Sequence, residues 1–122
     1  MKILLVEEKI ELSNQLAESF GNLTYDVITK SSSLGALEFL ENNTVDLIIS
    51  DLNMGHISGE ELAQVVKKKY GIPSILMSSN YNIVNGANFD AFILKPFDFD
   101  ELLELVKIVA AKAKAQRPQV MI

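Results

Sequence analysis

Five short apolar segments, rich in β-branched residues, recur along the chain and alternate with segments of helical spacing. They are KILLV at 2–6, YDVIT at 25–29, VDLIIS at 45–50, SILMS at 74–78 and AFIL at 91–94. Strands that alternate with helices predict βαβ units, whose right-handed crossovers build a parallel sheet with helices on both faces. Near-continuous apolar strands suit a sheet that is covered on both sides.

Four segments have the apolar spacing of helices. The first two carry leucine and phenylalanine repeats, namely Leu12, Leu16 and Phe20, then Leu34, Leu37 and Leu40. The third, 58–71, opens with Ser58 and Glu61 in capping-box spacing and closes on Gly71, a C-terminal stop signal. The last begins at Asp98, a predicted N-cap, and has an apolar stripe of Leu102, Val106, Val109 and Ala113.

A fourth helix is due between the last two strands, but residues 79–90 are rich in asparagine and contain a glycine. Such residues disfavour helix, so this helix should be short or irregular. We therefore expect a doubly wound α/β fold with five parallel strands and a shortened fourth helix. Residues 1–114 should form the domain. Residues 115–122 have no helical stripe, and Pro118 would interrupt a helix there, so they should form a tail or the start of a linker.

Composition limits the classes of function. A chain of 122 residues suits one domain, and the absence of cysteine excludes disulfides and thiolate metal sites. A net charge of −5 argues against nucleic-acid binding, and the lysines at 67–69 are explained by the C-terminus of a helix. No apolar stretch is long enough to span a membrane, so a cytoplasmic location is the default expectation.

Polar side chains gather where the predicted strands end. Glu7 and Glu8 follow the first strand, Asp51 ends the third, and Lys95 follows the fifth. Ligands of open α/β sheets bind in the crevice beyond these carboxyl ends. If the first and third strands are neighbours, three carboxylates converge and would repel by about 1 to 4 kcal/mol per pair at ~4 Å.

A divalent cation would relieve this repulsion. Mg²⁺ prefers a few carboxylate oxygens completed by water and phosphate, and Mn²⁺ could take its place. Together with Lys95 it would neutralise the site and prepare it to accept a phosphoryl group by in-line attack of a carboxylate. Asp51 is the best candidate nucleophile because it stands at the strand tip.

The motifs also resemble a known family. The acidic pair after the first strand, SDLNM around Asp51 with Gly59 eight residues later, Ser78 closing the fourth strand, and KPF at 95–97 are similar to the receiver domain of two-component response regulators. The likeness runs from residue 2 to about 114 and implies a flavodoxin-like fold with the strand order 2-1-3-4-5. Five matches in order, each at its own strand end, make it specific.

The resemblance implies a phosphorelay module. Asp51 would accept a phosphoryl group from a histidine kinase or a histidine phosphotransfer protein. Glu7, Glu8, Asp51 and the backbone carbonyl of Asn53 would hold Mg²⁺. Asn53 and Asn80 fall at positions that tune hydrolysis of the aspartyl phosphate. The domain would be no enzyme in the ordinary sense, although it assists its own phosphorylation and dephosphorylation.

The resemblance also implies a switch. Lys95 and Ser78 would contact the phosphoryl group, small Ser79 would leave its site accessible, and Phe92 would change rotamer with Ser78. The Lys95–Pro96 bond is a candidate cis peptide. A downstream output domain or protein would read the switched state, without nucleic acid or membrane binding by this segment, and homodimerisation is left open.

Three departures from the family pattern bear on function. Two glutamates stand where the family most often has at least one aspartate, and Gly55 stands where proline is usual. Only 16 residues separate Ser78 from Lys95, which shortens the fourth helix on the surface that usually reports the state of a receiver.

Other functions stay open beside the phosphorylatable receiver. The departures support a pseudo-receiver, a protein-binding module without regulated phosphorylation. An aspartyl-phosphate hydrolase would want a second acid two residues after the nucleophile, where this chain has Asn53. A flavin carrier would want a phosphate-cradling loop after the first strand, where Glu7 and Glu8 would repel phosphate.

Overall fold

The computed structural model describes residues 1–80 and 89–116. In chain order the elements are β1 (Lys2–Val6), α1 (Ile10–Gly21), β2 (Asp26–Lys30), α2 (Ser33–Leu40), β3 (Leu47–Asp51), α3 (Gly59–Tyr70), β4 (Ser74–Ser78), β5 (Ala91–Leu94) and α4 (Phe99–Ala115). All strand pairs are parallel, and the strand order is β2-β1-β3-β4-β5. The predicted doubly wound sheet and its order are confirmed.

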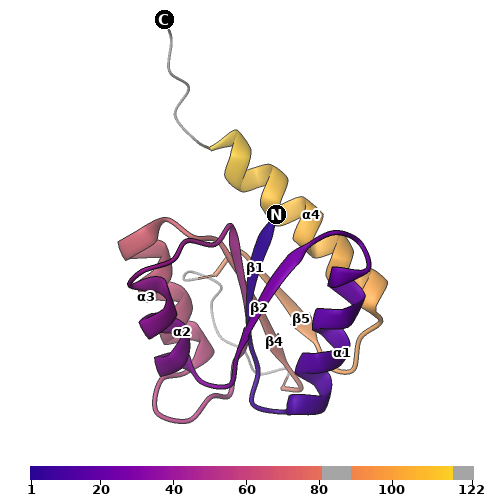
Figure 1. Ribbon diagram of the computed structural model, residues 1–122, viewed down its shortest axis with the longest axis horizontal. Coiled ribbons are helices and arrows are strands. Elements are labelled where there is room, and N and C mark those ends of the chain that lie inside the picture. Colours follow the sequence, from indigo (N-terminus) through magenta and orange to yellow (C-terminus); the bar gives the residue numbers. More distant parts are fainter. Residues whose placement is uncertain (81–88, 117–122) are drawn as a thin grey trace, which may run out of the picture.

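Helices cover both faces of the sheet, with α1 and α4 on one side and α2 and α3 on the other (Figure 1). Each face has its own apolar core. Side chains alternate along β1, so that Ile3 and Leu5 enter the core under α1 and α4, whereas Leu4 and Val6 enter the other. Both sides of each central strand are therefore buried, which explains the nearly unbroken apolar runs.

Three expected details are corrected. β2 begins at Asp26 and β3 at Leu47, rather than at 25 and 45. In α2 the buried residues are Ser33, Ala36 and Leu40, whereas Leu34 is 60% exposed. A repeat of three residues drifts around a helix with 3.6 residues per turn, so Leu34 lies about 120° from Leu40 and cannot share its face.

The predicted boundaries of α3 are found. Ser58 Oγ accepts from the Glu61 N–H, and the Glu61 carboxylate accepts from the Ser58 N–H, which completes the capping box. Gly71 closes the helix with φ 68°, a left-handed conformation that glycine adopts without steric cost. The lysines at 67–69 lie in the last turn, where cations complement the helix dipole.

The start of β5 is anchored by Asp90. Its N–H donates to the Ser74 carbonyl at 3.0 Å, and its carboxylate accepts from the Ser74 N–H at 2.8 Å and from Lys67 Nζ at 3.0 Å. At the other end of β5, the Lys95 N–H donates to the Ser78 carbonyl at 2.8 Å. The register of this edge strand is thus fixed at both ends, and Lys95 emerges beside the end of β4.

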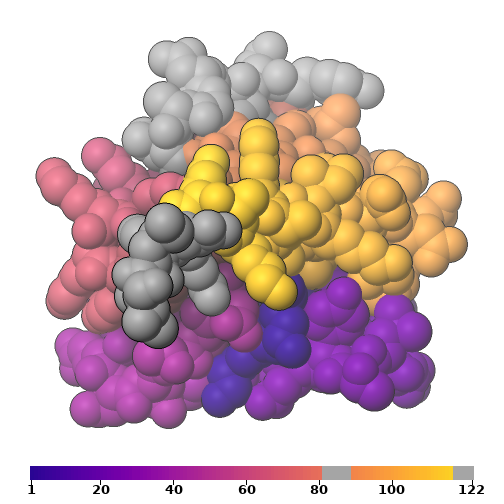
Figure 2. Space-filling model, turned by 90° about the horizontal axis from the view of Figure 1, so that it is seen from above, coloured from indigo at the N-terminus to yellow at the C-terminus, as the bar shows by residue number. Residues whose placement is uncertain are grey.

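The short fourth helix is expected within 79–90, mostly at residues 81–88, and most of the expected tail, 115–122, falls on residues 117–122. Both lie outside the described residues. None of the helices in 1–80 and 89–116 is long and apolar enough to cross a bilayer. Figure 2 looks onto the amino-terminal ends of the strands, where α4 (yellow) lies beside the start of β1 (indigo).

Candidate functional site

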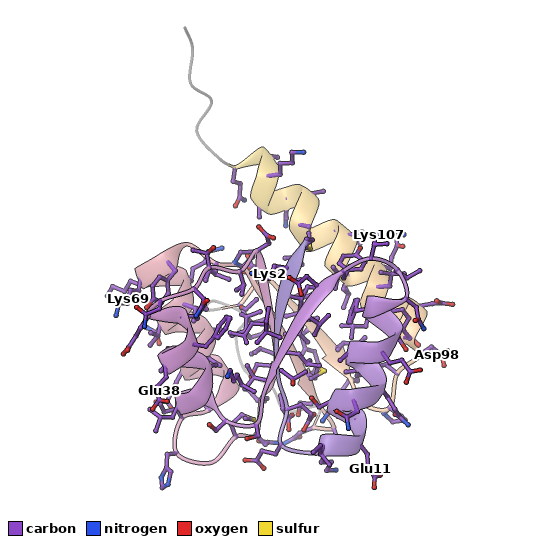
Figure 3. All side chains as sticks on the ribbon, in the orientation of Figure 1. Lys2, Glu11, Glu38, Lys69, Asp98 and Lys107 are labelled. Atoms are coloured by element: carbon purple, nitrogen blue, oxygen red, sulfur yellow. The ribbon has the colours of Figure 1, made fainter. Side chains whose placement is uncertain are left out.

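A pocket of about 550 Å³ lies beyond the carboxyl ends of the strands. It is lined by Glu8, Lys9, Leu12, Asp51, Asn53, Ser79, Lys95, Pro96 and Phe97. These residues come from segments that follow β1, β3, β4 and β5, because parallel strands deliver their C-terminal residues to one edge. Glu11, labelled in Figure 3, marks the same end of the molecule, whereas Lys69 lies toward the opposite end.

Lys95 is the central cation of this site. Its Nζ lies 2.8 Å from Glu7 Oε1 and 3.6 Å from Asp51 Oδ1. The Glu7 side chain is completely buried, and the side chains of Asp51 and Lys95 are only 15% and 17% exposed. The other Glu7 carboxylate oxygen accepts from the Lys9 N–H at 3.0 Å. A buried carboxylate is therefore held by a cation and a backbone donor, as burial of charge requires.

Asp51 has an unfavourable environment for its own negative charge. Burial raises the pKa of its carboxyl above the ordinary 3.8, and the Glu7 charge adds to this effect. Lys95 and a hydrogen bond from the backbone N–H of Asn53 act in the opposite direction, but burial is the largest effect. In the absence of a further cation, the ionised nucleophile is a cost to the fold.

This cost predicts that Asp51→Asn stabilises the protein when divalent cations are chelated. Because the pKa of Asp51 is higher in the folded state than in the unfolded state, stability is lost as pH rises from 3.8 through the folded-state pKa. The variant lacks this loss, so its melting temperature should exceed that of the wild type near neutral pH, and the gap should close toward pH 3.

Melting curves in EDTA from pH 3 to 8 measure the effect. The exposed acid Glu18 in α1 offers a control, since Glu18→Gln should leave the melting temperature close to that of the wild type. A wild type as stable as Asp51→Asn at neutral pH would contradict the burial argument.

Gly59 sets the position of the backbone at Asp51. A Cβ at Gly59 would lie 2.2 Å from the Asp51 carbonyl oxygen and 2.8 Å from the Leu52 Cα. The Gly59 N–H also donates to the Leu52 carbonyl at 2.8 Å. Only glycine permits this approach of the first residue of α3 to the end of β3.

The three predicted metal carboxylates are not equivalent. Glu8 and Asp51 line the pocket with Asn53, whereas Glu7 is bound to Lys95. In residues 1–80 and 89–116, no three side chains among His, Cys, Asp and Glu come close enough together to hold a metal ion. The expected convergence of three carboxylates is therefore not found. Two carboxylates with water and phosphate oxygens still suit Mg²⁺, so the donor set at the pocket fits this ion.

The remaining predicted residues lie around the pocket in different ways. Ser79 lines it, but the buried Ser78 hydroxyl accepts from the Asn80 N–H at 3.0 Å and so faces the following loop. Phe92 lines a separate hollow between β5 and α4, which shares Lys95 and Pro96 with the pocket. The Lys95–Pro96 peptide bond is cis.

Two contacts near the site could not be predicted from sequence motifs. Ser33 Oγ of α2 donates to the Ile57 carbonyl in the loop after Asp51, at 2.9 Å. Asp90 anchors β5, the strand that carries Lys95 to the pocket. Neither residue belongs to a recognisable motif, because each contact depends on how separate elements pack.

Comparisons with known proteins agree with this geometry. The family model described as "Response regulator receiver domain" matches residues 3–107. Response regulator ArlR of Staphylococcus saprophyticus is 32% identical over 111 residues, covering 87% of this chain and 50% of that protein. The heme response regulator HssR of the same organism is 28% identical over a similar stretch. The chain thus spans about half the length of these curated relatives.

Solved structures share the fold. The signal receiver domain of an HD domain-containing protein from Pseudomonas fluorescens superposes with a TM-score of 0.87 at 22% identity, covering 94% of this chain and 98% of that one. Response regulator TrrA of Thermotoga maritima, solved in complex with Mg²⁺-BeF, gives a TM-score of 0.80 at 29% identity, covering 88% of this chain and 97% of that one. The chain belongs to the response regulator receiver domain family.

Proposed function

We propose that this domain accepts a phosphoryl group on Asp51 and thereby switches between two conformations in a two-component pathway. The observation that carries the proposal is the geometry around Lys95. Lys95 Nζ lies 2.8 Å from Glu7, which follows β1, and 3.6 Å from Asp51, which ends β3. Lys95 and Asp51 both line the pocket. A nucleophilic carboxylate, a fixed cation and an open space beside them are what in-line phosphoryl transfer requires.

In the proposed reaction an Asp51 carboxylate oxygen attacks phosphorus while the bond from phosphorus to the donor nitrogen or oxygen breaks. The leaving group keeps the electron pair of that bond. Lys95 would move its contact from the Asp51 carboxylate to a phosphoryl oxygen. Its ammonium already lies between the acids, so little reorganisation precedes the neutralisation of the transferred charge.

Glu8, Asp51 and the Asn53 carbonyl are the proposed ligands of Mg²⁺, with Glu7 as a further ligand if it leaves Lys95. When bound, the ion would neutralise phosphoryl oxygens. Ser79 leaves the pocket open, and Asn53 and Asn80 would tune access of water to the aspartyl phosphate. Ser78 would swing its hydroxyl from the Asn80 N–H toward the phosphoryl group, and Phe92, in the hollow between β5 and α4, would change rotamer with it.

The proposed partners follow from this chemistry. A histidine kinase or histidine phosphotransfer protein would donate the phosphoryl group in the cytoplasm, and an output domain or protein would read the result. We also propose that the receiver ends near residue 114 and that 115–122 begin a linker. The half-length match to the curated relatives is consistent with an output region elsewhere in those proteins.

Incubation with acetyl phosphate and Mg²⁺, followed by intact-mass measurement, tests the proposed function. The wild type should gain the mass of one phosphoryl group only when Mg²⁺ is present, and Asp51→Asn should gain none. Because glutamates occupy both positions of the acidic pair and could weaken Mg²⁺ binding, the Mg²⁺ concentration should be varied over a wide range. No added mass at any Mg²⁺ concentration would favour the pseudo-receiver instead.

A further inference from the structure

The loop Leu52–Ser58, between β3 and α3, carries Asn53 into the pocket. The tip of the loop packs against little else. A Cβ at Gly55 would have no neighbouring atom within 4 Å, and His56 is exposed. The position of Asn53 therefore depends on restraints elsewhere in the loop.

The restraints near Asp51 come from the backbone. The Leu52 carbonyl accepts from both the Met54 and the Gly59 N–H groups, at 3.2 and 2.8 Å. The Met54 side chain is buried in the core under α2 and α3, and Ile57 packs against the same core. These contacts tie the start of the loop to its end through Leu52, but none of them engages the Ile57 carbonyl, so the path of the loop between its ends needs a further restraint.

That restraint comes from another element. Ser33, the first residue of α2, is buried, and its hydroxyl donates to the Ile57 carbonyl at 2.9 Å. We propose that Ser33 is a positioning residue for Asn53, holding the loop after the phosphoacceptor in the conformation that binds Mg²⁺. The inference rests on the proposed function and adds to it a residue outside the pocket.

The loop that Ser33 holds is coupled to the nucleophile as well as to the pocket. The Asn53 backbone N–H donates to the Asp51 carboxylate, so the placement of the loop also orients the nucleophile. Loss of the Ser33 hydroxyl would leave the Ile57 carbonyl without its donor and free the far side of the loop. Removal of a group that hydrogen-bonds a metal ligand directly typically costs 10- to 100-fold in metal affinity, and Ser33 acts through the loop, so the lower end of this range is expected.

The adjacent serine provides a matched control. Ser32 Oγ accepts from the Gly35 N–H at 3.0 Å, so its hydroxyl caps α2, whereas that of Ser33 holds the loop. Ser32→Ala and Ser33→Ala each remove one hydroxyl hydrogen bond from the start of the same helix. Both should lower the melting temperature, but only Ser33→Ala should disturb the loop.

Two measurements on the full chain test the inference. Titration of the unphosphorylated protein with Mg²⁺, followed by ¹H–¹⁵N NMR, should give about tenfold weaker binding for Ser33→Ala than for wild type or Ser32→Ala. Amide hydrogen exchange should be faster at Asn53 and Gly59 in Ser33→Ala only.

Wild-type Mg²⁺ affinity in Ser33→Ala, or an equal loss in both variants, would overturn the inference. If the wild type itself bound no Mg²⁺, the proposed function would fail, and the exchange rates alone would decide about Ser33. Faster exchange confined to Ser33→Ala would then still support its positioning role, whereas equal rates in the two variants would refute it.

Discussion

Gly59→Ala is expected to lower the free energy of unfolding by about 3 kcal/mol or more, at the upper end of the usual cost of overpacking. The added methyl group would meet the Asp51 carbonyl oxygen at 2.2 Å and the Leu52 Cα at 2.8 Å. Both atoms belong to backbone, which cannot rotate away as a side chain can. Chemical denaturation of the two proteins measures the difference.

Gly21→Ala is the matched control for this substitution. Gly21 is the last residue of α1, and a Cβ there would meet no atom within 4 Å. Alanine favours helix over glycine, so this variant should be as stable as the wild type or more stable by up to about 1 kcal/mol. Equal stability of the two variants would show that α3 does not approach β3 as closely as described.

Lys95→Met is expected to destabilise the protein by about 2 to 3 kcal/mol at neutral pH, slightly below the usual cost of breaking a buried ion pair. The cost arises because the Glu7 side chain, with no exposed area, would lose the cation 2.8 Å away, and among residues 1–80 and 89–116 only the Lys9 N–H would still donate to it. Denaturant unfolding in EDTA measures this loss without interference from bound metal.

Two further variants separate charge burial from general damage. Lys67 also has a carboxylate partner, Asp90, at 3.0 Å, but its side chain is 50% exposed. Lys67→Met should therefore cost less than about 1 kcal/mol. Adding Glu7→Gln to Lys95→Met should recover at least half of the loss, since the fully buried charge would be gone and only the partly exposed Asp51 carboxylate would lack the cation. A double variant no more stable than Lys95→Met would contradict this account of Glu7.

The fold and the place of the site follow from local patterns in the sequence. Apolar runs separated by helical spacing predicted a parallel, doubly wound sheet, and the family resemblance implied its strand order. Parallel strands bring Asp51 and Lys95 to one edge. The capping box at Ser58 was also predictable, because a helix start is encoded within four residues. These features depend on short segments or on topology alone.

The details that sequence did not predict depend on packing between distant segments. Glu7 and Glu8 are adjacent and chemically identical, so only the structure distinguishes the one that binds Lys95 from the one that lines the pocket. The bond from Ser33 to Ile57 spans 24 residues and joins α2 to a loop. Leu34 was assigned to the core by its spacing, but the sheet selects the Ser33, Ala36 and Leu40 face.

The claim on which this account depends is that groups after β1, β3 and β5 form one phosphoryl-binding pocket. Addition of Mg²⁺ and beryllofluoride, a phosphoryl mimic, to isotope-labelled protein tests it directly by NMR. The account predicts saturable shifts at Glu8, Asp51, Asn53 and Lys95 that require both reagents and vanish in Asp51→Ala. Shifts confined to the opposite end of the sheet, or none in the presence of both reagents, would contradict it.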